Sequence, residues 1–482
     1  MKTLVVSLLS LPLVLASTLL TGCAGSSPKP LNTSNINLIF VSSEDIAYQA
    51  SGDIDPTTAN LTNRGLQRSL LMGHFLKESV LGGANVTSIH ALQPMTHLQT
   101  AAEYPDMAAL QTVQQFAMLN QISLPTGSSS AVSGNSFPIY ASYSPESVPA
   151  TGVAQPVLPC PICQGLDFND IHGLNESMVD RIIQAKIPGY NVLSAPWETV
   201  RAMLANINSL EGYRLQIPSN YAGPNYIYAI SITPAGKATL VTYNSHLNPP
   251  SKYPVLSVKT DNPCKPPTPI HISVRGGSGG AKIPAGINSN ETVYIVRHAD
   301  AHPIPTWDDG NFVGAGQWRA LSLPSALKGK IHPDEVYAVD PSVGLPPLSG
   351  NAPSSYIRPA MTVLPYAIAN NLPYRVAAEV PFLAQNAPQL ATYASDYFFT
   401  GGRFSNHKIL LGWESAHIPI TVNALLASYH SAQTAPDWSS DDYDSIWTVR
   451  IDGQGNLSVD NDLCEGINSA DLPKTPPPFG SQ

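Results

Sequence analysis

The feature that most constrains the fold is an internal repeat. Three pairs of segments recur in the same order at an offset of roughly 250 residues, far longer than the period of a solenoid repeat: 37–41 with 292–296, 65–70 with 316–321, and 89–94 with 336–341. The first pair is apolar and strand-like, the second opens a helical pattern with glycine, and the third is another short strand. Three matches in one order are difficult to obtain by chance, so the sequence predicts two related units. Strands that alternate with helical patterns favour an α/β sandwich with a mostly parallel sheet in each unit.

The limits of the two units follow from a fourth match and from local composition. Both copies finish with a hairpin signal, a short strand followed by a glycine-containing turn, at 230–236 and 449–455. The stretch between the copies is rich in Pro, Gly and Lys, which is typical of a linker. We therefore expect four segments after the N-terminal region: a first domain at 36–250, a linker at 251–287, a second domain at 288–466 and a Pro-rich tail at 467–482.

The N-terminal residues predict export and lipidation. Lys2 precedes the apolar stretch Leu4–Leu20, which has the character of a signal-peptide core. The stretch runs into Leu-Thr-Gly and Cys23, which resembles the bacterial lipobox. We therefore expect a signal peptide at 1–22, a lipid on Cys23 and a flexible tether at 23–35. Alanine after the cysteine favours the outer membrane, facing the periplasm or the surface, and the lipid is the one membrane contact that we expect.

Four cysteines remain besides the lipidated one. Outside the cytoplasm an even number of cysteines predicts disulfides. Cys160 and Cys163 are close enough in sequence for a local structural bridge, which we favour over a redox pair because no thioredoxin-like pattern surrounds them. Cys264 and Cys464 would then join the linker to the C-terminal end. Three pairings of the four cysteines are possible, and the sequence does not choose among them.

The charge balance excludes one class of function. With 25 basic and 34 acidic residues the net charge is −9, so the chain lacks the positive surface of a general nucleic-acid-binding protein. An anion site must instead be built from a few well-placed cations. The glycine run 276–280 matches the G-x-S-x-G pattern of serine hydrolases, but the proline and glycine that follow it interrupt any helix, so we interpret it as flexible linker.

Polar residues in the second copy follow successive predicted strands. Arg297 and His298 come directly after an apolar strand, Arg358 lies beyond the next strand, and His417 follows the strand at 407–413. Ligands of open α/β sheets bind outside the carboxyl ends of the strands. We therefore expect these side chains to collect at one edge of the sheet.

This ordered set resembles the histidine phosphatase superfamily, whose first strand ends in Arg-His-Gly or Arg-His-Ala. The resemblance covers most of 291–463 and implies a three-layer α/β/α sandwich for each of two tandem domains. It makes His298 the nucleophile that forms a phosphohistidine, and it makes Arg297, Arg358 and His417 the ligands of the phosphoryl oxygens. A neutral imidazole is a competent nucleophile near neutral pH, and guanidinium groups suit the equatorial oxygens of a transferring phosphoryl group.

The resemblance is weakest at the general acid. Members of the superfamily place a carboxylate near the phosphate site, in one branch an aspartate directly after the second histidine. Ile418 stands at that position here, which counts against a phytase-like activity. Glu414 and Asp300 are the favoured candidates for the acid. The implied chemistry needs no metal ion or other cofactor.

The first copy has lost the reactive groups. Ser42 and Ser43 stand in place of the Arg-His pair, His97 roughly takes the place of the second arginine, and no histidine follows the strand at 190–194. We interpret this copy as catalytically degenerate. The sequence as a whole predicts an envelope-anchored phosphohydrolase that acts on a small phosphomonoester through a phosphohistidine. The alternative is a non-catalytic envelope lipoprotein that binds an anion or a partner through histidine phosphatase-like domains.

Overall fold

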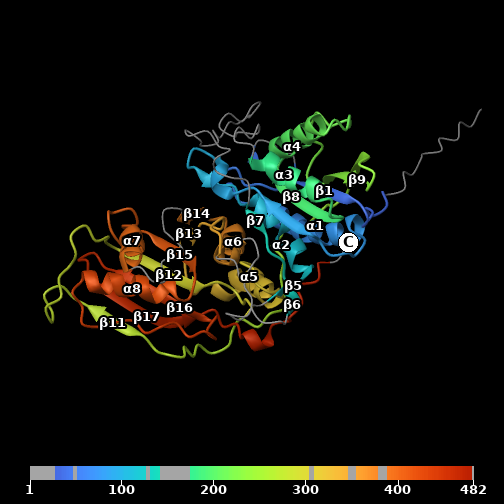
Figure 1. The fold of residues 1–482 in the computed structure, drawn as a ribbon. Helices are drawn as coiled ribbons and strands as arrows, with labels where there is room; N and C mark the ends of the chain where they lie inside the picture. The colour runs from blue at the N-terminus through green and yellow to red at the C-terminus, as the bar shows by residue number, and fades with distance from the viewer. Residues whose placement is uncertain are drawn as a thin grey trace, which may run out of the picture.

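The computed structural model describes residues 28–46, 51–125, 131–141, 174–302, 309–345, 354–377 and 388–479. The expected signal peptide, the lipidation site at Cys23 and the pair Cys160 and Cys163 lie outside these residues. Helices and strands alternate along most of the chain, and the fold is of the mixed α/β type (Figure 1). Within the described ranges, no helix has the length and apolar character needed to cross a bilayer.

The first sheet has six strands in the order β10-β9-β1-β8-β2-β7. Its central strand β1 pairs in parallel with β8 and antiparallel with β9. β2 is parallel to both β8 and β7, and β9 forms a hairpin with β10. The strands are β1 Ile36–Ser43, β2 Ser88–Ala91, β7 Tyr140–Ala141, β8 Gly189–Pro196, β9 Tyr226–Ile232 and β10 Ala238–Asn244.

The second sheet has seven strands in the order β11-β17-β16-β12-β15-β13-β14. Its central strand β12 pairs in parallel with β15 and antiparallel with β16. β13 is parallel to both β15 and β14, and β16 forms a hairpin with β17. The strands are β11 His271–Val274, β12 Glu291–Arg297, β13 Glu335–Val339, β14 Tyr374–Ala377, β15 Lys408–Trp413, β16 Ser445–Ile451 and β17 Leu457–Cys464.

The two sheets share one topology. Without β11, the order and the direction of the six remaining strands of the second sheet repeat those of the first, with β12 in the place of β1 and β15 in the place of β8. We call residues 36–244 the first half and residues 271–464 the second half. Two further short ladders lie outside the main sheets, one between β3 Leu98–Gln99 and β4 Tyr104–Pro105 and one between β5 Gln121–Pro125 and β6 Ala131–Asn135.

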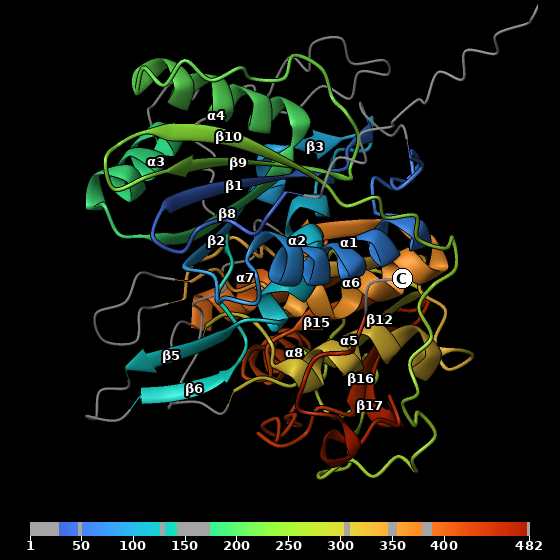
Figure 2. The same cartoon turned by 90° about the vertical axis from the view of Figure 1, so that its right-hand side faces the viewer.

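Each half also has four helices in matching positions of the chain. They are α1 Asn63–Phe75, α2 Ala108–Met118, α3 Leu174–Ala185 and α4 Trp197–Leu210 in the first half, and α5 Gly314–Leu327, α6 Arg358–Asn370, α7 Pro388–Phe399 and α8 His417–Ser428 in the second. Figure 2 shows α3 and α4 above the first sheet, then α1 and α2, then α5 and α6 against the second sheet.

Side-chain burial confirms this layering in the second half. On β15, Leu410 packs in the same core as α5 and α6, whereas Ile409 and Leu411 pack with α7 and α8 on the opposite face. This alternation is the period of two that a strand buried on both faces requires. The core on the α5 and α6 side continues into the first half, so the two halves share one apolar interior.

Polar contacts also join the halves through the central helices. The Gln114 side chain donates to the Asn311 side-chain oxygen at 2.9 Å, and Gln317 donates to the side-chain oxygen of Gln115 at 3.2 Å. The four side chains are buried, where an amide without a hydrogen-bond partner would be costly. The layer of α1, α2, α5 and α6 is therefore an interface that contains polar contacts as well as apolar ones.

One local motif occurs in both halves at the start of the central helices. A Cβ atom on Gly65 would lie 2.2 Å from the backbone oxygen of Asp53, and a Cβ atom on Gly316 would lie 2.4 Å from the backbone oxygen of Asp300. Glycine is required at both positions because an aspartate carbonyl approaches the helix so closely. One turn further along, Arg68 in α1 is paired with Asp53, as Arg319 in α5 is with Asp300.

Three of the segments expected outside the two domains make contacts with the body of the protein. The segment 251–287 is not purely a linker, because His271–Val274 forms β11 at the edge of the second sheet. In the expected tether, Leu31 is buried and its backbone nitrogen donates to the Val80 carbonyl at 2.9 Å. The tail also packs on the body, since the Trp318 indole donates to the carbonyl oxygen of Thr475 at 2.8 Å.

The segment before β11 is held by a covalent link. Cys264 and Cys464 form a disulfide with their Cα atoms 5.3 Å apart. It ties the segment before β11 to the end of β17, which is the pairing that the sequence suggested when the other two cysteines bridge locally.

Candidate active site

A cavity of about 800 Å³ lies at the carboxyl ends of β12 and β15 in the second half. Its lining includes Arg297 at the end of β12, His298 directly after it, Arg358 at the start of α6, and Glu414 after β15. The structure thus brings four of the predicted site residues into one pocket. They meet there because the parallel strands β12 and β15 end on the same side of the sheet.

His298 is held in one orientation by its own neighbours. Its backbone nitrogen donates to the Trp413 carbonyl at 2.8 Å, which continues the ladder between β12 and β15. Its Nδ1 atom lies 2.8 Å from the carbonyl oxygen of Ala299. Because a carbonyl oxygen only accepts, Nδ1 carries the proton, and Nε2 of the neutral ring keeps its lone pair.

Burial and the two arginines keep this ring neutral. The pKa of His298 is held well below its ordinary value, first by burial and then by the positive charges of Arg358 and Arg297. A histidine in this state is a nucleophile over a wide pH range, because it does not take up a proton near neutral pH.

Arg297 is positioned by the loop that precedes β16. Its Nη1 atom donates to the carbonyl oxygens of Ser440 at 2.6 Å and Asp442 at 3.2 Å, and its guanidinium carbon lies 3.9 Å from the centre of the Tyr443 ring. The Nε–H group is buried and has no hydrogen-bond partner among the described residues. Loop contacts therefore fix one side of the guanidinium and leave a donor for an anion.

Arg358 is the first residue of α6 and is buried. Its Nη1 atom donates to the Asn311 carbonyl at 3.3 Å, and its guanidinium carbon lies 4.6 Å from the centre of the Tyr356 ring. Pro359 follows at a position where the missing N–H costs nothing, because the first turn of a helix has no intrahelical acceptor for it. The N-terminus of α6 adds partial positive charge to that of the guanidinium.

Glu414 and His417 form a pair after β15. The Nδ1 atom of His417 lies 2.8 Å from the Glu414 carboxylate, which also accepts the backbone N–H of Ala416 at 2.7 Å. Burial alone would raise the pKa of Glu414, but the hydrogen bond and charge of His417, together with Ala416 and Ser415, lower it overall. His417 is buried and stacks on Trp413 with ring centres 6.1 Å apart. Glu414 thus orients His417, and its lowered pKa makes it a poor proton donor.

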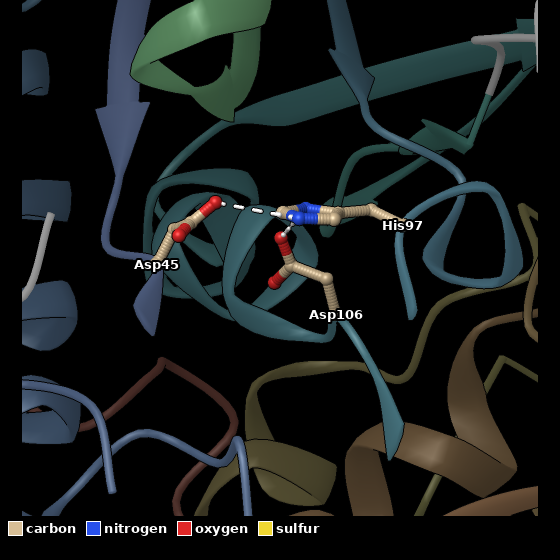
Figure 3. A group of neighbouring side chains, drawn as sticks. All are labelled: Asp45, His97 and Asp106. Carbon is tan, nitrogen blue, oxygen red and sulfur yellow. Dashed lines mark hydrogen bonds and ion pairs between the residues drawn. The ribbon is translucent and has the colours of Figure 1, made fainter. Parts of the chain in front are cut away.

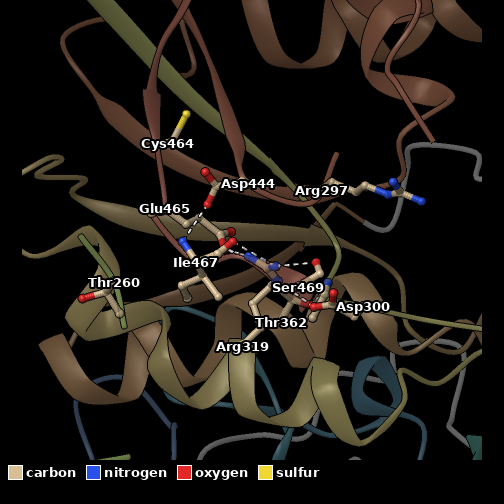
Figure 4. A network of polar contacts seen from close by, with 12 residues as sticks. Thr260, Arg297, Asp300, Arg319, Thr362, Asp444, Cys464, Glu465, Ile467 and Ser469 are labelled. Carbon is tan, nitrogen blue, oxygen red and sulfur yellow. Dashed lines mark hydrogen bonds and ion pairs between the residues drawn. The ribbon is translucent and has the colours of Figure 1, made fainter. Parts of the chain in front are cut away.

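Asp300, the other expected general acid, does not line the cavity. Its carboxylate accepts the Nε–H of Arg319 at 2.6 Å, and Arg319 also donates to Glu465 at 2.6 Å. Figure 4 shows Asp300 within this network, which continues to Ser469, while Arg297 points the other way. The geometry therefore gives Asp300 a structural role as the partner of Arg319.

Sequence reasoning missed the loop between α8 and β16. Asp437, Trp438, Asp441 and Tyr443 line the cavity from this loop. The one sequence signal was a dense group of aromatic and acidic residues between a helix and a strand, which is too common to single out without the fold.

Among the residues of the first half that the structure describes, the positions equivalent to these site residues carry other side chains. In the strand register, Ser42 and Ser43 occupy the positions in the first half that Arg297 and His298 occupy in the second, as expected. Trp197 is the first residue of α4, as His417 is of α8. The counterpart of Arg358 is Ala108, the first residue of α2. The expectation that His97 roughly takes that place is not met, because His97 lies in the connection between β2 and α2, before the helix begins.

His97 belongs to a buried cluster instead. Its Nδ1 atom lies 2.8 Å from Asp106 and its Nε2 atom 3.4 Å from Asp45 (Figure 3). Among the described residues, this is the group whose donor atoms lie close enough together to hold a metal ion. Burial opposes the charge on His97, but the two carboxylates raise its pKa overall. A protonated His97 between two carboxylates is a complete ion-pair cluster, so we assign it a structural role.

Comparisons with known proteins give similarity to solved structures only. No protein-family model matches the chain, and no curated protein matches its sequence. The native glucosyl-3-phosphoglycerate phosphatase of mycobacteria is 13% identical, with 35% of this chain and 97% of that chain covered at a TM-score of 0.22. Its complex with inorganic phosphate is 11% identical, with 37% and 99% covered and a TM-score of 0.23. A putative phosphohistidine phosphatase from Agrobacterium tumefaciens is 16% identical, with 34% and 92% covered and a TM-score of 0.20. The first two structures are of the same phosphatase.

Proposed function

We propose that the cavity at the ends of β12 and β15 is the active site of a phosphohydrolase, which acts on a phosphomonoester through a phosphohistidine at His298. The observation that carries the proposal is the hydrogen bond from His298 Nδ1 to the Ala299 carbonyl. It makes Nε2 the nucleophilic atom of a neutral ring in a cavity lined by two guanidinium groups. The motif order shared with the histidine phosphatase superfamily agrees with this role.

The chemistry has two displacements at phosphorus. First, the lone pair of His298 Nε2 attacks phosphorus, the ester P–O bond breaks, and the alcohol oxygen leaves with the electron pair and takes up a proton. Water then attacks phosphorus and gives up a proton, the P–N bond breaks with its electron pair returning to Nε2, and inorganic phosphate leaves. The Ala299 carbonyl stabilises the positive ring that exists between the two steps.

The two arginines stabilise the charge that is redistributed in each transition state. The buried Arg297 and Arg358 need little reorganisation, because loop carbonyls, aromatic rings and the start of α6 already hold them. Preorganised donors of this kind are worth about 3 kcal/mol each by comparison with oxyanion-hole donors. His417 is buried and is not itself among the residues that line the cavity, but Glu414, which orients it, is, so His417 is the second imidazole of the proposed site from behind that lining.

We place the proton source for the leaving group at the rim of the cavity. Glu414 is engaged by His417 and Asp300 by Arg319. His302, Asp437, Asp441 and Tyr443 are the remaining titratable side chains of the lining. A phenolic leaving group needs little protonation, so aryl phosphates are the substrates that test the nucleophile independently of the acid.

We further propose that the chain arose by duplication, with a degenerate first domain and an active second domain, and that it is anchored in the bacterial envelope through Cys23. The shared strand order and the paired Gly-Asp-Arg motifs support the duplication. The anchoring rests on the sequence of residues 1–23 alone. In this view the first half supports α5 and α6, from which Arg319 and Arg358 extend.

The test is hydrolysis of 4-nitrophenyl phosphate from pH 4 to 8 by a fragment that lacks residues 1–30, with a chelator present. We expect turnover by the wild type and its loss in His298→Ala, with an unchanged unfolding temperature. Folded protein without turnover at any pH would instead favour a non-catalytic module that binds anions.

A further inference from the structure

The charge at the rim of the active-site cavity is opposite to the charge at its floor. Arg297 and Arg358 surround His298, whereas Asp437 and Asp441 line the same cavity from the loop before β16. Both aspartates are exposed, and no ion pair to either is found within the described part of the chain. A phosphomonoester seated on His298 would therefore share the cavity with two carboxylates.

An aromatic side chain stands between these carboxylates in the sequence. Trp438 lines the cavity, its indole N–H donates to the Asp442 carbonyl at 2.8 Å, and its ring stacks on Trp447 with centres 5.2 Å apart. These two contacts hold the indole in place. A fixed aromatic ring with nearby carboxylates is the usual protein environment for a substituted ammonium group.

The same arrangement disfavours additional negative charge on the substrate. The two guanidinium groups serve a single phosphoryl group at the nucleophile. A second phosphate or a carboxylate on the alcohol would lie toward Asp437 and Asp441, where like charges repel. The carboxylates at the rim would thus repel an anionic alcohol group as well as attract a cationic one.

We infer that this cavity selects phosphomonoesters whose alcohol carries a positive charge, that is, phosphorylated amino alcohols. The inference rests on the proposed function of the same site. It goes further by naming the leaving group and the residues that recognise it, Asp437, Trp438 and Asp441.

Competition against 4-nitrophenyl phosphate hydrolysis tests the inference with isosteric ligands. Phosphocholine carries the positive charge, and 3,3-dimethylbutyl phosphate has the same shape without it. We expect phosphocholine to have an inhibition constant about ten-fold lower at low salt, with the advantage shrinking as ionic strength rises. 2-Phosphoglycolate, which adds a negative charge, should bind more weakly than both.

The variant Asp437→Asn/Asp441→Asn should bring the ratio of the two inhibition constants close to one. Glu211→Gln/Asp462→Asn, which removes two exposed carboxylates that are not part of the cavity lining, is the matched control and should keep the ratio. Equal constants in the wild type, or an unchanged ratio in the first variant, would overturn the inference. Tightest binding of glycerol phosphate would also overturn it, because the rim would then recognise hydroxyl groups.

A binding measurement separates this inference from the proposed function. If 4-nitrophenyl phosphate is not hydrolysed, calorimetric titration with phosphocholine and its neutral isostere still reports the preference. A preference without turnover would support the inference and contradict catalysis. Turnover without a preference would do the reverse.

Discussion

The Glu414 carboxylate accepts the Nδ1–H of His417 at 2.8 Å, and this contact assigns both residues their roles. It directs His417 Nε2 away from the carboxylate, and it keeps Glu414 ionised in spite of burial. A carboxylate that orients an imidazole is a recurrent device for fixing one tautomer. Glu414 is thus a positioning residue for His417.

Replacing Glu414 with glutamine tests that assignment. The amide does not offer the same acceptor to His417 Nδ1–H, so we expect kcat/KM for 4-nitrophenyl phosphate to fall by about 10- to 100-fold, by comparison with carboxylates that orient histidine ligands in other proteins. A double-mutant cycle with His417→Asn should be strongly non-additive, because each change removes the same interaction. Additive losses would show that Glu414 acts independently of His417, as a general acid would.

The loop before β16 positions Arg297 through Tyr443. Tyr443→Phe removes the hydroxyl that lies 3.3 Å from Arg297 Nη2 but keeps the ring under the guanidinium, whereas Tyr443→Ala removes both. We expect a loss in kcat/KM of a few-fold for the phenylalanine variant and about ten-fold more for the alanine variant. Steady-state kinetics of the two variants beside Arg297→Ala checks this order. Equal losses in the two tyrosine variants would show that the ring does not help to position Arg297.

The low pKa of His298 predicts a specific pH dependence of stability. The unfolded chain binds a proton at this residue near pH 6.5, and the folded chain does not. The contribution of His298 to the free energy of unfolding is therefore largest above about pH 6.5. It decreases as the pH falls from there toward the lower pKa of the folded state, by at most about 1.4 kcal/mol per pH unit. Denaturant unfolding from pH 7 to 5 should show a shallower pH slope in His298→Asn. An identical slope would mean that His298 is protonated in the folded protein.

Gly65 and Gly316 occupy matching positions in the two halves, and replacing them tests whether both positions require glycine. Gly65→Ala and Gly316→Ala each place a methyl group within 2.4 Å of a backbone oxygen, so we expect each to destabilise by about 3 kcal/mol or more. Gly52→Ala is the control: its Cβ atom meets nothing within 4 Å, and the cost is the strain of its φ of 71°, about 1–2 kcal/mol. A small effect at either Gly65 or Gly316 would show that the close approach is not maintained.

Strand and motif patterns in the sequence were sufficient to predict the elements that form the pocket. β1, β12 and β15 lie where apolar runs predicted them, and parallel pairing then brings Arg297 and His298 beside Glu414. Side-chain partners were not predictable, because Asp300 turns to Arg319 and Glu414 to His417 through contacts that depend on helix positions. The loop residues at the rim of the cavity were also missed, because a loop of irregular structure has no periodic signal in the sequence.

The central claim is that His298 becomes phosphorylated during turnover. Rapid mixing with 4-nitrophenyl phosphate, an alkaline quench that preserves phosphohistidine, and peptide mass spectrometry would locate the modification. We predict one phosphate on His298 in the wild type and none in His298→Ala. Turnover without modification of His298, or a phosphate on another residue of the wild type, would contradict the proposed mechanism.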